Sequence, residues 1–425
     1  MVLGDINMYR TIMVWMTVML WSVSALCKEN ERSNTEIDKI NRRIDQIERN
    51  ISDSNKNSQE PLICETSLRE GMEGIAVSGG MTLIIQGTHN ANGDDVLQGS
   101  EDTTDATYSV DLGFEKKFND SASGFIHCET GDGQGVENEL TVFSNVNRDA
   151  DDSDNGLSVT EAWIDYAFGD SGFSTTVGKL DPTVFIDTNE YANDETTQFM
   201  GHVFRNSAVI PFPDNALGMC VSYAIYDIVG VDILTLDGKD DADDIGHDFF
   251  SGLQVNVMHE IFEKSGNYRF IAWLDKRRYV RWDNPAEEKD TGSGFGISMD
   301  QTLTPWMGVF ARYHWTDEDI YRDGEEFSLK QDISFGFSIA GKTWGRRNDV
   351  LSIAYGVIDP SDAYKEATNR IAYDEKHAEC FYNLSITDQI ALTPHVHVIW
   401  DPYGGDAVNG DNTLTVGGLR IQVNF

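Results

Sequence analysis

The chain has 425 residues and a formal net charge of −39, from 71 acidic and 32 basic residues. Because phosphate contacts need clustered lysine and arginine, this charge excludes a general nucleic-acid binder. The mean hydropathy of −0.37 excludes a polytopic helical membrane protein, which needs repeated apolar runs of about 20 residues. A membrane β-barrel stays compatible with this value, since only alternate residues of its strands face lipid.

The N-terminus carries a continuous apolar run over residues 11–26. It follows Arg10 and ends in Val23-Ser24-Ala25, the small-x-small pattern of a signal-peptidase site. We therefore expect residues 1–25 to be a secretory signal peptide; a membrane anchor or a lipid on Cys27 are the alternatives. Export leads to an oxidising compartment, but the five cysteines are scattered, so we expect buried or lipid-facing thiols rather than disulfides.

A short amphipathic helix is expected next, over residues 26–60. Its isoleucines are spaced three and four residues apart, as in two heptads of a coiled coil. Isoleucine at both core positions favours a coiled coil of three or four helices. Two heptads are marginal alone, so this periplasmic helix would assist a trimer formed elsewhere. The alternative is a helix packed on the main domain. Residues 61–74 read as a polar linker. The isoleucines are Ile37, Ile40, Ile44, Ile47 and Ile51.

From residue 75 to 425 the sequence shows strand-like alternation in place of helical periodicity. The pattern predicts sixteen strands, at approximately 75–88, 106–118, 122–131, 157–169, 172–180, 216–226, 230–236, 248–261, 267–278, 293–302, 305–316, 328–341, 349–358, 374–386, 389–400 and 412–425.

The connections between these strands alternate between long and short. Asn119-Asp120-Ser121 is a short one, whereas 132–156 and 181–215 are long. Tight turns at one end and large loops at the other are the plan of an antiparallel outer-membrane barrel, whereas a soluble sandwich has no need of this alternation. The sequence therefore predicts an all-β, 16-stranded antiparallel transmembrane β-barrel over residues 75–425, with both chain ends on the periplasmic side.

The last strand shows the alternation clearly. Leu419, Ile421 and Val423 share one face, and Arg420 and Gln422 share the other. Lipid offers no hydrogen bonds to stray backbone groups, so strands of this kind span it only in a closed barrel. The terminal Phe425 is similar to the ending that barrel-assembly machinery recognises. That machinery and outer-membrane lipid are therefore expected partners.

Several segments resemble the OprB-like carbohydrate-selective porins. They are 177–182 (VGKLDP), 185–194 (FIDTNEYAND), 206–213 ending in Pro-Phe-Pro, and the closing strands through 418–425 (GLRIQVNF). The resemblance covers roughly residues 75–425 and implies a sixteen-stranded, trimeric outer-membrane porin for passive diffusion of sugars and similar small solutes. His397 stands where the family pattern leads us to expect glutamine.

A porin needs a lumen lined by hydrogen-bonding groups and no catalytic centre, so we predict no enzyme and no catalytic residue. The longest connection, 181–215, is expected to fold inward as a constriction; the alternative is an outer loop against a trimer neighbour. Strand parity and this loop nominate the pore-lining or solute-binding residues, for each of which a structural ion pair is the alternative. They are Glu161, Trp163, Asp165, Lys179, Asp181, Asp187, Asn189, Arg205, Arg312, His314, Glu379, Asn383, His397 and Arg420.

No cofactor and no metal site are predicted. His395 and His397 share a strand face, but no third ligand is evident near them. Acidic loops, including 240–244 and 317–319, allow loose binding of Ca²⁺. Four functions stay open: a sugar-permissive porin, a general or cation-preferring porin, a structural or adhesive surface barrel with a plugged lumen, and a secreted soluble glycan-binding β-protein. The first is favoured.

Overall fold

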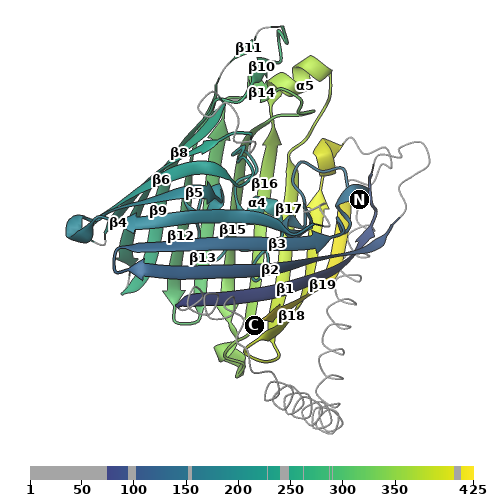
Figure 1. The fold of residues 1–425 in the computed structure, drawn as a ribbon. Coiled ribbons are helices and arrows are strands. Elements are labelled where there is room, and N and C mark those ends of the chain that lie inside the picture. Colours follow the sequence, from purple (N-terminus) through teal and green to yellow (C-terminus); the bar gives the residue numbers. More distant parts are fainter. Residues whose placement is uncertain are drawn as a thin grey trace, which may run out of the picture. The chain divides into compact units, whose positions relative to one another are not determined.

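Sixteen long strands pair in a closed antiparallel ring in the computed structural model (Figure 1). The predicted signal peptide and coiled-coil helix, and the linker except for Gly74, lie outside the residues that the structure describes. Those residues are 74–93, 102–151, 156–226, 228–239, 248–261, 263–286, 288–289, 291–405 and 413–425.

The ring closes where the first strand pairs with the last, and each other strand pairs with its neighbours in the chain. Within the described part of the chain, the ring comprises β1 (Ile75–His89), β2 (Thr104–Asn119), β3 (Ala122–Asp132), β4 (Ser158–Ala167), β5 (Phe173–Leu180), β6 (Ala216–Ile225), β7 (Val229–Asp237), β8 (Phe249–Ile261), β9 (Lys264–Asp275), β12 (Gly292–Thr304), β13 (Met307–Thr316), β15 (Leu329–Ala340), β16 (Val350–Pro360), β17 (Glu375–Ser385), β18 (Ile390–Trp400) and β19 (Thr413–Asn424).

All sixteen predicted strands occur, each within three residues of its expected bounds. The structure adds elements in the long connections that alternation does not predict. A small separate sheet has the strand order β11–β10–β14, and its strands come from two connections expected to be loops. The added elements are β10 (Tyr279–Arg281), β11 (Glu288–Lys289), β14 (Ile320–Arg322), α4 (His202–Arg205), α5 (Asp362–Thr368) and the 3₁₀ helices η1 (Glu137–Glu139), η2 (Arg148–Asp151), η3 (Gly169–Ser171), η4 (Pro182–Val184), η5 (Gly341–Trp344) and η6 (Pro402–Gly405).

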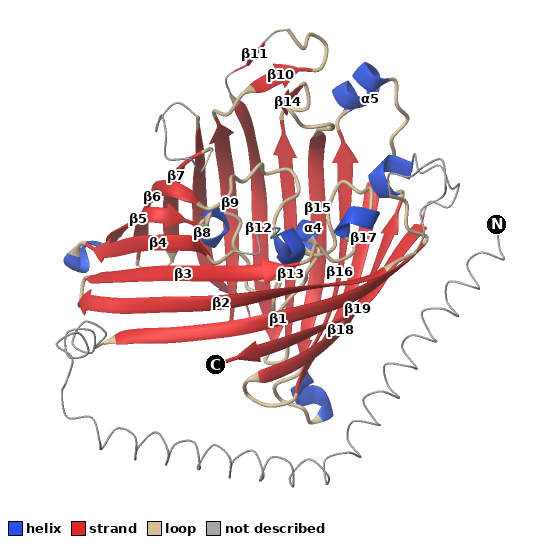
Figure 2. Ribbon diagram, turned by 45° about the vertical axis from the view of Figure 1, so that its right-hand side comes forward, coloured by secondary structure: helices blue, strands red, loops and turns tan. Residues whose placement is uncertain are grey.

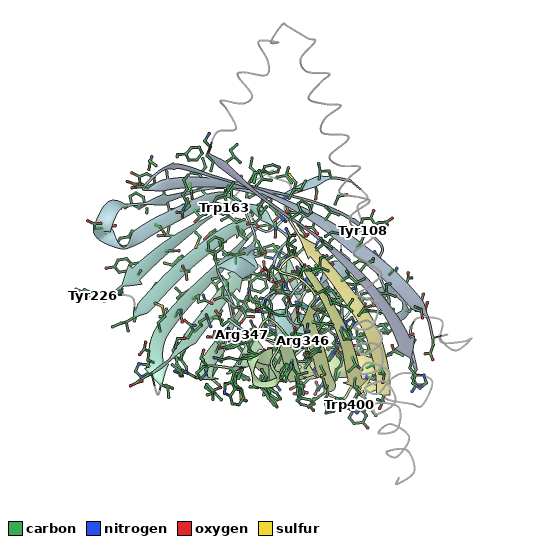
Figure 3. The ribbon with its side chains drawn as sticks, turned by 90° about the horizontal axis from the view of Figure 1, so that it is seen from below. Tyr108, Trp163, Tyr226, Arg346, Arg347 and Trp400 are labelled. Atoms are coloured by element: carbon green, nitrogen blue, oxygen red, sulfur yellow. The ribbon has the colours of Figure 1, made fainter. Side chains whose placement is uncertain are left out.

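The two faces of each strand differ as the sequence predicts. On β15, Ile333 and Phe335 are 44% and 52% exposed on the outside, whereas Asp332 and Ser334 are 2% exposed inside. This is the outward apolar band of a barrel set in lipid. No helix among the described residues is long and apolar enough to cross a membrane. Figure 3 shows the side chains around the strands in a view from below.

The seam between β1 and β19 is closed by the last residue of the chain. Backbone bonds run from Gly79 to Phe425 and back, with N···O distances of 3.1 and 2.9 Å. A Cβ at Gly79 would overlap the Phe425 ring, so a larger residue at this point of the seam would displace that ring. The Phe425 side chain remains 66% exposed on the outside of the barrel.

Long connections fold inward into the interior of the ring (Figure 2). In Figure 2, α4 lies within the ring, whereas β10, β11, β14 and α5 stand beyond the strand ends at one end. An apolar cluster joins the loop residues Phe199 and Phe204 to the wall residues Phe310 and Phe381. The rings of Phe199 and Phe381 meet edge to face at 5.0 Å. The core of this barrel therefore lies between the wall and an inward connection.

Candidate functional site

The connection over residues 181–215, called the inward loop below, lines one side of the lumen. Pro182 begins η4, where the Asp181 side chain caps the turn by accepting from Thr183 N at 2.8 Å. Its second short helix, α4, packs against β15 and β16. The position of this loop favours the inward constriction over a loop outside the barrel.

Arg312 on β13 holds the middle of the inward loop. Its guanidinium donates from Nε to Asp187 Oδ1 at 3.0 Å and from Nη2 to the carbonyls of Asp187 and Ala192 at 3.0 and 2.7 Å. Its Nη1 reaches Phe204 O at 2.6 Å. Arg312 is 3% exposed. A single arginine thus satisfies three carbonyls and one carboxylate of a loop buried against the wall.

Asp187 is the carboxylate that Arg312 binds in the inward loop. Its Oδ2 accepts from Ser207 N at 2.8 Å, and its Oδ1 lies 3.2 Å from His314 Nε2. Burial alone would raise the pKa of Asp187, but the Arg312 guanidinium and the His314 imidazole beside it outweigh burial and lower the pKa to about 2. Asp187 is therefore ionised at neutral pH, as its partners require.

Two further wall residues, Glu379 and Arg420, also hold the loop. Glu379 on β17 accepts from Met200 N and Gly201 N, both at 3.0 Å. Arg420 on β19 donates from Nη1 to Gln198 O at 3.0 Å. Glu379 and Arg420 are each 1% exposed. Charged wall groups of both signs thus hold the middle of the loop, between residues 187 and 204.

A second connection, between β3 and β4, folds inward beside the first. Glu375 on β17 accepts from Phe143 N at 2.8 Å and from Ser144 N at 3.1 Å. Ser144 Oγ in turn accepts from Val203 N of the inward loop at 3.1 Å. The two connections are therefore bonded to each other as well as to the wall, which gives the lumen a rigid lining.

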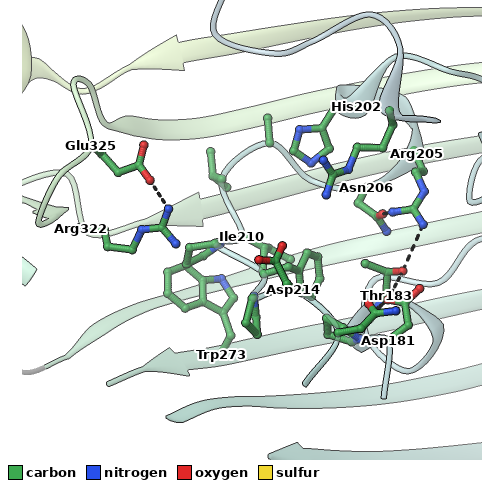
Figure 4. A pocket seen from close by; sticks show the side chains of 18 of the residues that line it. Asp181, Thr183, His202, Arg205, Asn206, Ile210, Asp214, Trp273, Arg322 and Glu325 are labelled. Atoms are coloured by element: carbon green, nitrogen blue, oxygen red, sulfur yellow. Dashed lines mark hydrogen bonds and ion pairs between the residues drawn. The ribbon is translucent and has the colours of Figure 1, made fainter. Parts of the chain in front are cut away.

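A cavity of about 780 Å³ lies between these connections and the wall. Arg205, Thr183 and Asp181 lie together on one side of it, and Arg322 with Glu325 lies on another (Figure 4). Arg205 donates to Asn206 Oδ1 at 2.8 Å and is ion-paired with Glu195. The cavity thus combines charged groups of both signs with apolar surface.

Two titratable groups of this lining are shifted by burial. Burial raises the pKa of Asp149 to about 7, with Glu195 adding to the shift and a hydrogen bond from Ser109 opposing it. Burial also lowers the pKa of His202 to about 3, and the neighbouring Arg148 adds to that shift. His202 is therefore neutral at physiological pH and acts in the lining as a polar, uncharged ring.

The predicted site residues fall into three groups. Lys179, Asp181 and Arg205 border the main cavity, whereas Asn383 borders a second cavity of about 400 Å³ beneath the inward loop. The second group lies on the inner face of β4, where Trp163 Nε1 donates to Glu161 Oε2 at 3.1 Å and Asp165 accepts from Thr176 at 2.9 Å. The third group, buried between loop and wall, is Asp187, Asn189, Arg312, His314, Glu379, His397 and Arg420.

This third group differs from the expectation that its members face water in the pore. Strand parity correctly places Arg312, His314, Glu379 and Arg420 on the inner face, but the inward loop covers that face. Parity reports only the side of a strand, and it carries no information on what lies against that side. Their observed contacts are the structural ion pairs and hydrogen bonds that formed the alternative.

Other cavity residues have no signal in strand alternation, because they come from connections. Arg148 and Asp149 belong to the β3–β4 connection, and Arg322 and Glu325 come from the segment around β14. Trp273 is an exception, because it lies on the ring strand β9; it borders the cavity but is only 3% exposed. The charged residues of long inward connections were the available sequence signal, but only 181–215 was singled out.

The described cysteines are free thiols, and two arginines after β9 have acidic partners. Cys128, Cys220 and Cys380 are free thiols, and Cys220 is buried. Arg277 donates to Asp275 at 3.0 Å, and Arg278 lies 3.2 Å from Asp323. Arg277 and Arg278 therefore tie this loop to acidic neighbours.

Comparison with known proteins identifies the family. The family model described as "Carbohydrate-selective porin, OprB family" matches residues 100–425. The chain belongs to this OprB family. Its family and fold are those of outer-membrane transport channels, and the OprB assignment makes it an outer-membrane porin for carbohydrates.

Two solved structures of one protein support the fold of this OprB-family porin. The high-pH structure of Pseudomonas putida OprB matches with a TM-score of 0.71 and 15% identity, over 85% of this chain and 96% of that one. The low-pH structure of the same protein matches with a TM-score of 0.50 and 12% identity, over 87% and 99%. A mutant of Rh. blastica porin has a TM-score of 0.46, 11% identity and coverage of 83% and 100%. A search of curated protein sequences gives no match.

Proposed function

We propose that neutral sugars cross this porin through the cavity between the inward loop and the wall, guided by Arg205 and Asp181. The observation that carries the proposal is that a donor-rich guanidinium and an acceptor carboxylate border one cavity on a single, firmly anchored loop. A sugar hydroxyl both donates and accepts, so groups of both kinds replace its water partners during passage.

The rigidity of the lining supports this assignment. Sugar selectivity needs groups held at fixed positions, because a mobile loop pays ordering entropy each time a solute binds. Arg205 is held by Glu195 and Asn206, and Asp181 by the turn that it caps.

The proposal is tested with the full chain reconstituted into liposomes. Arg205→Gln should slow the swelling caused by hexoses and disaccharides relative to the wild type, with the larger effect on disaccharides. Arg281→Gln is the matched control, because that arginine pairs with the exposed Asp283 at 2.7 Å and does not border the cavity. Equal swelling rates for all three proteins would remove Arg205 from the path.

One observation also favours a cation preference. Among the described residues, seven acidic side chains border the cavity against four basic ones. A negative excess in a confined lumen concentrates cations. A zero-current potential of the sign expected for potassium preference across a KCl gradient would support this second function, and sugar block of the same channels would show that both operate together.

The proposal extends to export and assembly, for which residues 1–60 are the basis. We infer removal of residues 1–25 on export and trimer formation assisted by the helix over residues 26–60, with the short turns facing the periplasm. N-terminal sequencing of the mature protein and its mass in detergent test these two steps. Mature chains that start at residue 1, or that are monomeric, would contradict them.

A further inference from the structure

We propose that Asp111, His127 and Glu129 form a divalent-metal site on the inner wall of the barrel, suited to a first-row transition ion such as Zn²⁺. One ligand atom from each residue lies within 4.8 Å of the other two. The set offers two carboxylate oxygens and one imidazole nitrogen, which are donors that zinc takes in proteins.

The pairing of β2 with β3 brings the three residues together. Asp111 lies directly opposite Glu129, and the neighbouring inward pair is Gly113 opposite His127. The alternate residues Tyr108 and Ile126 are 41% and 48% exposed on the outside of the wall. Because side chains alternate along a strand, all three ligands therefore point into the lumen.

The imidazole is oriented for binding. His127 Nδ1 lies 2.6 Å from Thr160 Oγ1, and His127 Nε2 lies 3.4 Å from Asp111 Oδ1. When Nδ1 carries the proton and donates to the hydroxyl, Nε2 presents its lone pair toward the carboxylates. Hydrogen bonding of the second ring nitrogen is the usual way in which a metal-binding histidine is fixed.

A β-bulge places Thr160 where it can do this. On β4, Glu161 pairs with His127 and Val159 pairs with Cys128, so Thr160 is the extra residue between two successive pairs. Bulges redirect one side chain of an otherwise regular strand. The bulge therefore has a physical role, because it positions the Thr160 hydroxyl that orients the His127 imidazole.

The electrostatics of the pairing also favour a bound cation. Two carboxylates directly opposite on neighbouring strands repel each other, which destabilises the pair. A divalent ion between Asp111 and Glu129 removes this repulsion. Metal–ligand distances of about 2.0–2.2 Å need the three groups to close by about 1 Å, which rotation of the partly exposed carboxylates can supply. Their side chains are reachable from the lumen, and Glu129 borders the main cavity.

Binding is measured by titrating ZnCl₂ into the refolded, untagged full chain in detergent by calorimetry. We expect one site whose affinity falls more than tenfold in His127→Ala and in Glu129→Gln. Thr160→Val should weaken it by about tenfold, since only the orientation of the ring is lost. Visible absorption of Co²⁺ provides a second readout, and the spectrum of the wild type should be lost in His127→Ala.

The matched control is His89→Ala. His89 also pairs with an aspartate, Asp102, at 3.1 Å, but the cluster of three ligands does not include it. Its zinc affinity should stay within twofold of the wild type. Glu129→Gln preserves the shape of the wall if His127→Ala fails to refold. Absence of a stoichiometric site in the wild type, or equal affinity in all variants because acidic loops hold the ion, would overturn the proposal.

Discussion

Arg312 Nε lies 3.0 Å from Asp187 Oδ1, although the two residues are 125 positions apart in the chain. Both side chains are buried, with exposures of 1% and 0%. This contact joins the wall strand β13 to the middle of the inward loop. It is central to the anchoring of the inward loop, because the same guanidinium also binds three loop carbonyls.

Removing the guanidinium should release the inward loop. In Arg312→Met the Asp187 carboxylate loses its main counter-charge inside the barrel, and breaking a buried pair from one side costs about 3–5 kcal/mol. We expect a larger and noisier single-channel conductance and faster proteolysis within residues 181–215. Arg346→Met is a matched control, since that arginine also pairs with a buried carboxylate, Asp349, but its own side chain is 46% exposed. Unchanged conductance in Arg312→Met would contradict the anchoring role.

The ion pair between Arg312 and Asp187 should persist in mild acid and be lost in strong acid. The folded pKa of Asp187 is about 2, below the ordinary value of 3.8. A lowered pKa stabilises the folded state above the unfolded pKa, and this contribution of about 2–3 kcal/mol is lost as the pH falls through 2. Pepsin should therefore spare the inward loop at pH 4 and cleave it near pH 2. In Asp187→Asn this dependence on pH should disappear; cleavage that begins at pH 4 in the wild type would contradict the shifted pKa.

A side chain at Gly308 should displace the loop from the wall. A Cβ there would overlap the Tyr191 ring, whose hydroxyl lies 2.7 Å from Thr302 Oγ1. We expect Gly308→Ala to destabilise the loop by about 1–3 kcal/mol, as overpacking does, and to increase its proteolysis. Gly417→Ala is the control, because nothing lies within 4 Å of a Cβ at that position. Equal proteolysis of both variants would show that the Tyr191 ring can move aside without destabilising the inward loop.

The thiols should report which face of the wall meets lipid. Cys128 and Cys380 lie on outward rows, and Cys220 points inward and is buried. In liposomes of a Cys27→Ser, Cys64→Ser chain, an apolar maleimide should label Cys128 and Cys380, whereas a charged methanethiosulfonate should label neither. Mass spectrometry of the peptides measures this. Rapid labelling of both by the charged reagent would contradict a lipid-facing position.

Alternation predicted the wall well because it is a local property. Leu419, Arg420 and Ile421 reveal two faces without any knowledge of their neighbours, and the chain order then specifies an antiparallel ring. The short turns were also predictable, because they too depend on residues that are neighbours in the chain. Alternation does not predict the small sheet, because Tyr279 pairs with Arg322 from a different connection. A pairing between two connections leaves no local pattern in the sequence.

The sequence by itself determined the sixteen strands, the face that each residue takes and the family, since these depend on spacing along the chain and on short motifs. Only the tertiary structure decided which inward residues border the cavity. Glu379 and Arg420 were on the correct face, but a loop about 200 residues away in the chain covers them and takes up their hydrogen bonds. The cavity is therefore bordered in large part by residues of the connections, whose positions depend on contacts across the whole barrel.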